Sequence, residues 1–224
     1  MVTIIVVANP RDASFIPLKV PILMPDLTTL NTWIQSGISF EEYMSQWKAK
    51  NAVSMRGLDR IQRRYRFYSK YNLERQERVD SEWQISTDFK EAVLSASGPS
   101  TWLFITDDWC VDSAYSLPLV REAAALRSSD ISLHILLKDE AHDVIDQFLT
   151  DGKRSIPKFI SISDGGEVEF EWGPQPEAIR LIRKDLIDSN AEGSVVSGTT
   201  IDWYADSGWL EVEKELTVVF NSAR

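Results

Sequence analysis

The side chain with the most reactive chemistry in this chain is its single cysteine, Cys110, which follows Trp109 and opens a helical pattern. Thiol exchange needs a thiolate, an accessible sulfur and a leaving thiol. A helix N-terminus supplies unpaired N–H groups and partial positive charge, which favour the thiolate. Asp107, Asp108 and Asp112 flank the thiol, and Asp112 is expected to modulate its pKa by favouring the neutral form. The two effects are of similar size, so a reactive thiol and an inert, packed cysteine both remain open.

Ser113 follows three residues after Cys110, in the stretch "CVDS". A hydroxyl cannot resolve a mixed disulfide as a second thiolate does, so an external thiol such as glutathione has to release the intermediate. A reactive Cys110 therefore predicts monothiol exchange or deglutathionylation. In that site Ser113 would hydrogen-bond the sulfur and Trp109 would cover it. We expect no resident cofactor, with glutathione only as a co-substrate.

The remaining residues with catalytic or ligand chemistry do not form a recognisable site. His134 alternates with apolar residues on a predicted strand, and His142 has no Cys or Glu at ligand spacing, so no metal site is expected. Paired acids such as Asp107-Asp108 fit solvated turns. The sequence also has no glycine loop of the kind that cradles phosphate.

Composition and charge narrow the function classes. The chain has 224 residues, of which 43% are hydrophobic, enough for a sizeable core. Its 24 basic and 34 acidic residues give a net charge of −10, which disfavours general binding to DNA or anionic membranes. One cysteine excludes an internal disulfide and fits a reducing compartment. No apolar run reaches the roughly 18 residues of a membrane span, so we expect a cytoplasmic protein.

Helical patterns dominate residues 1–97, after a short strand at residues 2–8. The segment up to Asp26 holds four of the nine prolines and is predicted to be an irregular, packed strap. The first clear helix begins near Ser39, because Glu42 lies at capping-box spacing from it.

Residues 56–78 carry eight basic and three acidic side chains, a local charge of 8 − 3 = +5, interleaved with aromatic residues. Arginines beside aromatic rings are typical of surfaces on which single-stranded RNA stacks. Spacings of 3, 4 and 3 residues instead favour a buried helix face, made of Leu58, Ile61, Tyr65 and Tyr68. We interpret the stripe as core packing, which leaves RNA as an unfavoured partner.

From residue 98 the sequence pattern changes from mainly helical to alternating strands and helices. Strands are predicted at residues 102–105, 131–137, 155–163 and 167–172, and helices at 110–127, 139–152 and 176–187. This order combines a parallel crossover with a terminal hairpin, and it predicts an α/β fold with a four-stranded mixed sheet flanked by helices. Residues 189–200 are small and polar and are predicted to be a linker, before a C-terminal helix that docks through residues 209–220.

These elements resemble the thioredoxin fold, and specifically the thioredoxin-like family, over about residues 99–188. The stretch "WLFITDDWC" is similar to the first core strand and its Trp-Cys turn, and Pro118 matches the proline that kinks the family's first helix. Ile156-Pro157 is similar to the family's cis-proline loop, and "GGEVEFEWG" to its closing hairpin. The pairing of W-C-x-D with S-I-P-K-F also resembles a bacterial monothiol subgroup that has a helical N-terminal extension.

The resemblance implies a site in which Cys110 faces the Pro157 loop, with backbone groups of Ile156 free to bind an extended thiol substrate. It also marks two departures. Ser113 replaces the second cysteine of the family's redox members, and Phe104 replaces their buried acid. The domains expected are an N-terminal strap and helical extension (1–97), a thioredoxin-like domain (98–188), and a linker with a C-terminal helix (189–224).

Two functions fit this set of residues. One is monothiol thiol-disulfide exchange through Cys110 with protein thiols or glutathione. The other is a non-catalytic thioredoxin-fold module that binds a protein partner through a degenerate active site.

Overall fold

The computed structural model describes residues 3–8, 15–20, 26–96 and 98–223. The strands are β1 (Thr3–Ala8), β2 (Phe15–Val20), β3 (Ser100–Thr106), β4 (Ile131–Leu137), β5 (Lys158–Ser163) and β6 (Val168–Trp172). The helices are α1 (Leu27–Ser36), α2 (Phe40–Ala52), α3 (Arg60–Glu82), α4 (Thr87–Ser95), α5 (Val111–Leu126), α6 (His142–Ile145), α7 (Glu177–Asp188), α8 (Gly193–Trp203) and α9 (Trp209–Ser222), with a π-helical kink, η1 (Tyr204–Gly208), between the last two.

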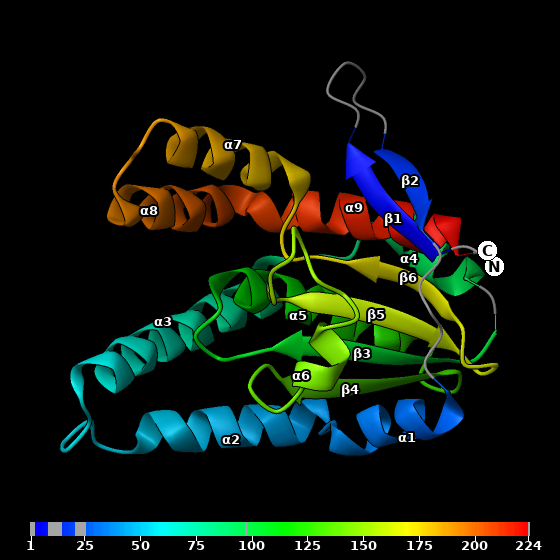
Figure 1. Cartoon of the computed structure of the whole chain (residues 1–224), viewed down its shortest axis with the longest axis horizontal. Helices are drawn as coiled ribbons and strands as arrows, with labels where there is room; N and C mark the ends of the chain where they lie inside the picture. Colours follow the sequence, from blue (N-terminus) through cyan, green and yellow to red (C-terminus); the bar gives the residue numbers. More distant parts are fainter. Residues whose placement is uncertain (1–2, 9–14, 21–25, 97, 224) are drawn as a thin grey trace.

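The strands form one mixed sheet in the order β2-β1-β6-β5-β3-β4 (Figure 1). β3 pairs with β4 in parallel and with β5 antiparallel, and β5 pairs antiparallel with β6. The predicted four-stranded mixed sheet is therefore confirmed as β6-β5-β3-β4. The N-terminal segment widens it, because β1 pairs in parallel with β6 and antiparallel with β2.

The prediction of an irregular strap up to Asp26 is wrong for residues 15–20, which form the edge strand β2. Pro17 lies within this strand, paired with Val6. An edge strand tolerates a proline because one side of its ladder makes no hydrogen bonds to a neighbouring strand. The prolines at positions 10, 21 and 25 lie outside the described residues.

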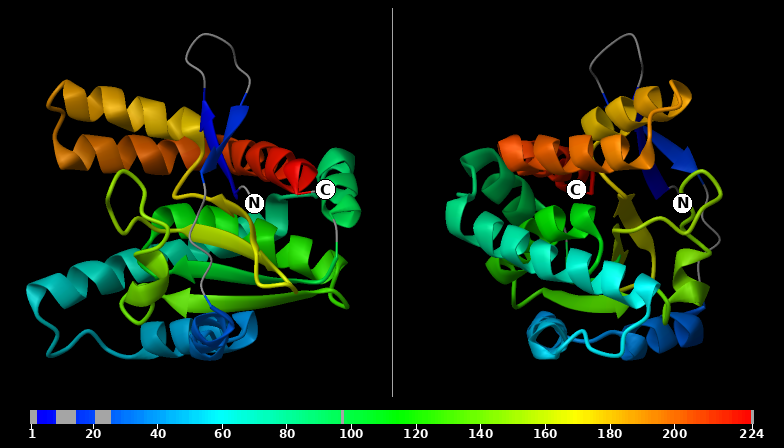
Figure 2. Two further views of the ribbon diagram at one scale, coloured as in Figure 1. Left: turned by 45° about the vertical axis from the view of Figure 1, so that its right-hand side comes forward. Right: turned by 90° about the vertical axis from the view of Figure 1, so that its left-hand side faces the viewer.

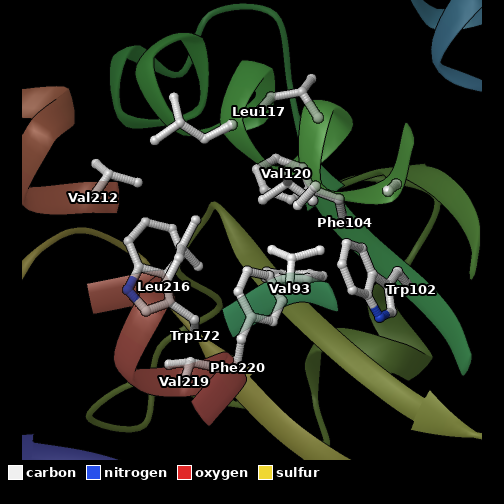
Figure 3. Close-up of a cluster of buried hydrophobic side chains, with 14 of the residues drawn as sticks. Val93, Trp102, Phe104, Leu117, Val120, Trp172, Val212, Leu216, Val219 and Phe220 are labelled. Carbon is white, nitrogen blue, oxygen red and sulfur yellow. The ribbon is translucent and has the colours of Figure 1, made fainter. Parts of the chain in front are cut away.

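Helices cover both faces of the sheet, as the two views of Figure 2 show. Successive residues of β3 point to opposite faces. Trp102 and Phe104 join the larger cluster with α4, α5 and α9, whereas Leu103 and Ile105 join a smaller cluster with α1 and α6. In the larger cluster the Trp102 ring stacks on Phe220 of α9, with centroids 5.4 Å apart (Figure 3). The C-terminal helix is thus part of the core, as predicted.

The predicted burial of the stripe on α3 is wrong. Ile61 is 60% exposed, and Tyr65 and Tyr68 are exposed as well. The buried residues of α3 are three polar ones, Ser69, Asn72 and Gln76, and the apolar Val79. The physical reason is that these polar groups find partners across the interface, which hydrophobic periodicity does not register.

Those partners tie the helical extension to the domain. The indole of Trp47 on α2 donates to Ser69 Oγ at 2.9 Å, and Gln76 Nε2 contacts the sulfur of Met44 at 3.0 Å. Asn72 Nδ2 donates to the carbonyl of Asp108, at 3.1 Å, in the turn that follows β3. α3 therefore holds the turn that carries Cys110.

Two further predictions are corrected. Residues 193–200, expected in a linker, lie in α8, because Val196 and Thr200 are buried and Arg183 of α7 donates to Thr200 Oγ1 at 2.8 Å. Small residues hide this packing in the sequence. The helix predicted at 139–152 is reduced to the short α6. No helix in the described part of the chain has both the length and the apolar character needed to cross a bilayer.

Candidate functional site: the Cys110 turn and its groove

Cys110 stands at the junction between β3 and α5. It is the N-cap residue of α5, with extended backbone (φ −83°, ψ 117°), and its carbonyl accepts the Ala114 N–H at 3.2 Å. Its own N–H donates to the Asp107 carbonyl at 3.0 Å, which closes the turn. The thiol thus lies at a helix N-terminus, as the sequence predicts.

The Cys110 thiol is nevertheless buried, at 6% exposure. Its S–H lies 3.5 Å from the carbonyl oxygen of Ile156, to which it donates a weak hydrogen bond. The Ile156-Pro157 peptide bond is cis, and the contact of the Ile156 carbonyl with the thiol places this loop against the sulfur. The thiol uses one acceptor position of the Ile156 carbonyl, and the expectation that backbone groups of Ile156 bind a substrate stays a prediction.

Burial decides the ionisation that the sequence left open. Burial, and then the nearby Asp112 carboxylate, raise the pKa of the Cys110 thiol to about 12. Hydrogen bonding from Ser113 and from backbone N–H groups at the start of α5 acts in the opposite direction and is outweighed. The helix-end effect is therefore smaller than the cost of burying a thiolate. At neutral pH the sulfur is a protonated S–H group.

Ser113 lies where the family's redox members have their second cysteine. It is 3% exposed, and its Oγ is buried without a hydrogen-bond partner of ordinary geometry among the described residues. This hydroxyl therefore gives the thiol only weak support. Phe104, at the position of the missing buried acid, is fully buried and packs near Phe159.

Asp112 is partly buried beside the thiol. Burial raises the pKa of its carboxyl to about 6, opposed by the Arg183 guanidinium and by a hydrogen bond from Tyr204. The Tyr204 hydroxyl donates to Asp112 Oδ1 at 3.0 Å, although the two residues are 92 positions apart. Tyr204 also stacks on Tyr115 of α5, with centroids 4.6 Å apart. Sequence reasoning missed Tyr204 because it followed a segment interpreted as a linker.

Trp109 connects the thiol turn to two other elements. Its ring lies 5.2 Å from the Tyr65 ring of α3, and Lys138 Nζ lies 5.3 Å from the same indole. Trp109 also packs against the smaller core cluster that contains Cys110. The side chain thus joins α3 to the turn that carries Cys110, and its role in covering the thiol stays a prediction.

An open groove of about 740 Å³ runs beside this turn. Its walls come from residues 109–112, from residues between 150 and 156, from Pro174 and from α7. Six cations line it, against two acids (Asp112 and Asp151): Lys138, Lys153, Arg154, Arg180, Arg183 and Lys184. Neighbouring acids outside the groove pair with Arg154, Arg180 and Lys184. The groove therefore keeps a positive excess in a chain whose net charge is −10.

Gly173 keeps the proline loop in place from behind. It has φ +118°, and a Cβ added there would lie 2.2 Å from the Pro157 carbonyl oxygen. Only glycine fits this close approach. In the described residues no group of three or more His, Cys, Asp or Glu side chains is placed to hold a metal ion.

Comparison with known proteins agrees with this geometry. A family model described as thioredoxin matches residues 57–186, which is 130 of the 224 residues. The chain belongs to the thioredoxin family. The match begins within the helical extension, so α3 and α4 are part of the region that resembles the family.

Two solved structures share the fold of this thioredoxin-family chain. A protein of unknown function from Pseudomonas aeruginosa has a TM-score of 0.55 and 14% identity, over 90% of this chain and 100% of its own. An HIV epitope scaffold has a TM-score of 0.56 and 16% identity, over 87% of this chain and 98% of its own. Identities this low support the fold alone. No curated protein matches the sequence.

The structure brings together all the residues predicted for the site: Trp109, Cys110, Asp112, Ser113, Ile156 and Pro157. The catalytic roles of Cys110, Ser113 and Trp109, and the substrate-binding roles of Ile156 and Pro157, stay predictions. The cations of the groove were missed, because they come from separate segments that no single motif joins.

Proposed function

We propose that this thioredoxin-family protein is a non-catalytic binding module, in which the groove beside Cys110 holds a segment of a partner protein. The observation that carries the proposal is the state of the thiol. The Cys110 thiol is 6% exposed and donates to the Ile156 carbonyl, and burial raises its pKa to about 12, so the sulfur is protonated at pH 7. Thiol exchange requires the thiolate.

The groove supplies what a binding module needs. Its volume lies in the range of ordinary ligand sites, and exposed apolar side chains of α7, Leu181 and Ile187, line it beside the cations. Apolar contact with a few placed charges is the usual composition of such a site. The arrangement supports binding without any covalent step.

Affinity capture with three variants tests the proposal. Cys110→Ser removes the thiol, Leu181→Glu places a charge in the groove, and Leu210→Glu places the same charge on α9 as a control. We expect the proteins bound by the wild-type chain to be retained by Cys110→Ser and Leu210→Glu and lost by Leu181→Glu. Loss of these proteins on Cys110→Ser alone would contradict the proposal.

Monothiol exchange or deglutathionylation is the second candidate, favoured by the position of Cys110 at the start of α5, opposite Pro157 and against the groove. In that reaction the Cys110 thiolate attacks the mixed disulfide of a protein with glutathione. It forms a new disulfide with the glutathione sulfur and releases the protein sulfur as a thiolate. A second glutathione thiolate then attacks this disulfide, which regenerates the Cys110 thiolate and releases glutathione disulfide. Incubation with oxidised glutathione, followed by mass spectrometry of the native protein, decides between the candidates, because only this one predicts an adduct on Cys110.

Placement in the monothiol W-C-x-D-S subgroup belongs to the same proposal. It is supported by Cys110, Asp112 and Ser113 in one helical turn and by the helices α1–α4 that precede this turn. A cytoplasmic location is proposed with it, because the single cysteine has no disulfide partner within the chain.

A further inference from the structure

The first half of α3 exposes aromatic side chains that a monomeric protein normally buries. Phe67 is 53% exposed, Tyr71 41% and Tyr68 38%. The Phe67 ring contacts both tyrosines, with centroids 4.6 Å from Tyr71 and 6.1 Å from Tyr68. Figures 1 and 2 show the start of α3 and the end of α2 projecting beyond the strands. A contiguous apolar patch of this kind marks an interaction site.

Arginine side chains flank these rings on the same helix face. Arg60 and Arg64 are exposed, at helical spacing from Phe67 and Tyr71, and this set of five residues, with Tyr68, is called the α3 surface. Arg63 and Arg66 turn back instead to backbone carbonyls of the α2–α3 connection. The face that points away from the body is therefore both aromatic and cationic.

The charge of this region differs in sign from the rest of the chain. Residues 56–78 carry +5, so the remaining residues carry −10 − 5 = −15. Seven of the eight cations here are arginines. Protein interfaces are enriched in arginine and aromatic residues and depleted in lysine. The composition thus matches a surface for an acidic protein.

The α3 surface is continuous with the Cys110 groove. Arg64 of the α3 surface lies over the Tyr65 ring, 5.6 Å from its centroid, and the same ring contacts Trp109, which lines the groove. The groove is also lined by more cations than acids, six against two, although three of the cations pair with acids outside it. One partner segment that lies in the groove would therefore meet cations and aromatic rings along both parts.

We propose that the α3 surface is the second half of the partner-binding site and that it recognises an acidic protein segment with apolar or aromatic side chains. This inference rests on the proposed binding function. Single-stranded nucleic acid is the less favoured occupant, because the rings pack on one another rather than standing as separate stacking platforms, and because the chain is acidic overall.

Fluorescence anisotropy with labelled peptides tests the inference. The probes are a peptide of alternating Glu and Tyr, a Gln-Tyr peptide of equal length, and single-stranded oligouridine. We expect the Glu-Tyr peptide to bind most tightly and to weaken as salt rises. The double variant Arg60→Gln/Arg64→Gln should weaken it by about tenfold or more, and Phe67→Ser/Tyr71→Ser by a similar factor. The control Lys90→Gln/Lys214→Gln, which removes two cations on other helices, should leave it unchanged.

The outcomes separate this inference from the function on which it rests. If Leu181→Glu abolishes binding of the Glu-Tyr peptide and the α3 variants do not, the result supports binding in the groove and overturns the role of the α3 surface. If the α3 variants abolish binding and Leu181→Glu does not, the result supports the α3 surface as a binding site and contradicts binding in the groove. Tighter binding of oligouridine, or no binding of the Glu-Tyr peptide, overturns the inference. The substituted α3 positions are exposed, and thermal unfolding of each variant verifies its fold.

Discussion

The Cys110 turn and the α3 surface are linked by the contact between Trp109 and Tyr65, yet their functional side chains differ in exposure to solvent. In the turn, the thiol is 6% exposed and the Ser113 hydroxyl 3%. On α3, an aromatic cluster lies open to solvent, with Phe67 at 53%. The contrast teaches that the cysteine position is buried in this chain, whereas aromatic side chains of the helical extension are exposed.

The same contrast appears in the charges. Around the thiol, burial outweighs hydrogen bonding and raises the pKa values of both Cys110 and Asp112, so the site is poor at holding negative charge of its own. On α3, Arg60 and Arg64 are exposed, and along the groove six cations face two acids, although three of the six also pair with acids outside the groove. A closed thiol beside an open cationic surface favours recognition over exchange.

The largest expected effect on stability is the difference between substituting a buried phenylalanine and an exposed one. Phe89 is fully buried between Trp83 and Phe220, whereas Phe67 lies on the α3 surface. Phe89→Ala should lower the free energy of unfolding by about 3–5 kcal/mol, because it leaves a cavity. Phe67→Ala should lower it by less than about 1 kcal/mol. Urea denaturation of both variants checks this, and a comparable loss in Phe67→Ala would show that α3 is not an open surface.

A smaller loss is expected at the loop behind the thiol. Gly173→Ala places a Cβ against the Pro157 carbonyl at a positive φ, and should lower the free energy of unfolding by about 2–3 kcal/mol. Gly193→Ala is the matched control, because no atom lies within 4 Å of its added Cβ; it should change stability by less than about 0.5 kcal/mol. Equal stability of the two variants would mean that the proline loop is not held as described.

The pH dependence of stability gives the smallest effect per side chain. Burial raises the pKa of Glu215 to about 7 and those of Asp107 and Asp112 to about 6. Because these values exceed the ordinary ones, the folded state binds more protons, and the stabilisation present below about pH 4 is lost as the pH rises through about 6 to 7. Each of these carboxyls should lower the free energy of unfolding by on the order of 1–2 kcal/mol from about pH 5 to about pH 8.

Urea denaturation across this pH range measures the effect. Repeating it at high salt screens the net charge of −10 but not the buried acids, so the slope should persist. Stability that rises with pH over the same range would be evidence against buried, protonated carboxyls around the site.

The sequence predicts those features of the structure that depend on residues close together along the chain. The strands β3 to β6 in their order along the chain, the Ser39 cap of α2 and the place of Cys110 at the start of α5 follow from local patterns and were predicted correctly. The burial of the thiol was not predictable, because it depends on Ile156, 46 residues away. Tyr204 comes from still further along the chain.

The α3 helix shows a second limit. Its periodic stripe correctly predicted a helix, but periodicity alone does not say which side the body covers. The buried polar residues Ser69, Asn72 and Gln76 each find a partner on α2 or on the turn before Cys110. Such pairings depend on tertiary geometry, and a hydrophobic pattern cannot report them.

Alkylation of Cys110 against pH tests the central claim most directly. The native protein is treated with iodoacetamide over a range of pH, beside a urea-denatured control, and the modification of Cys110 is followed by mass spectrometry. We predict that native Cys110 stays unmodified at neutral pH, that its reactivity rises only toward the pKa of about 12, and that the denatured chain reacts readily. Rapid modification of the native protein, with an apparent pKa at or below about 8.5, would contradict the account.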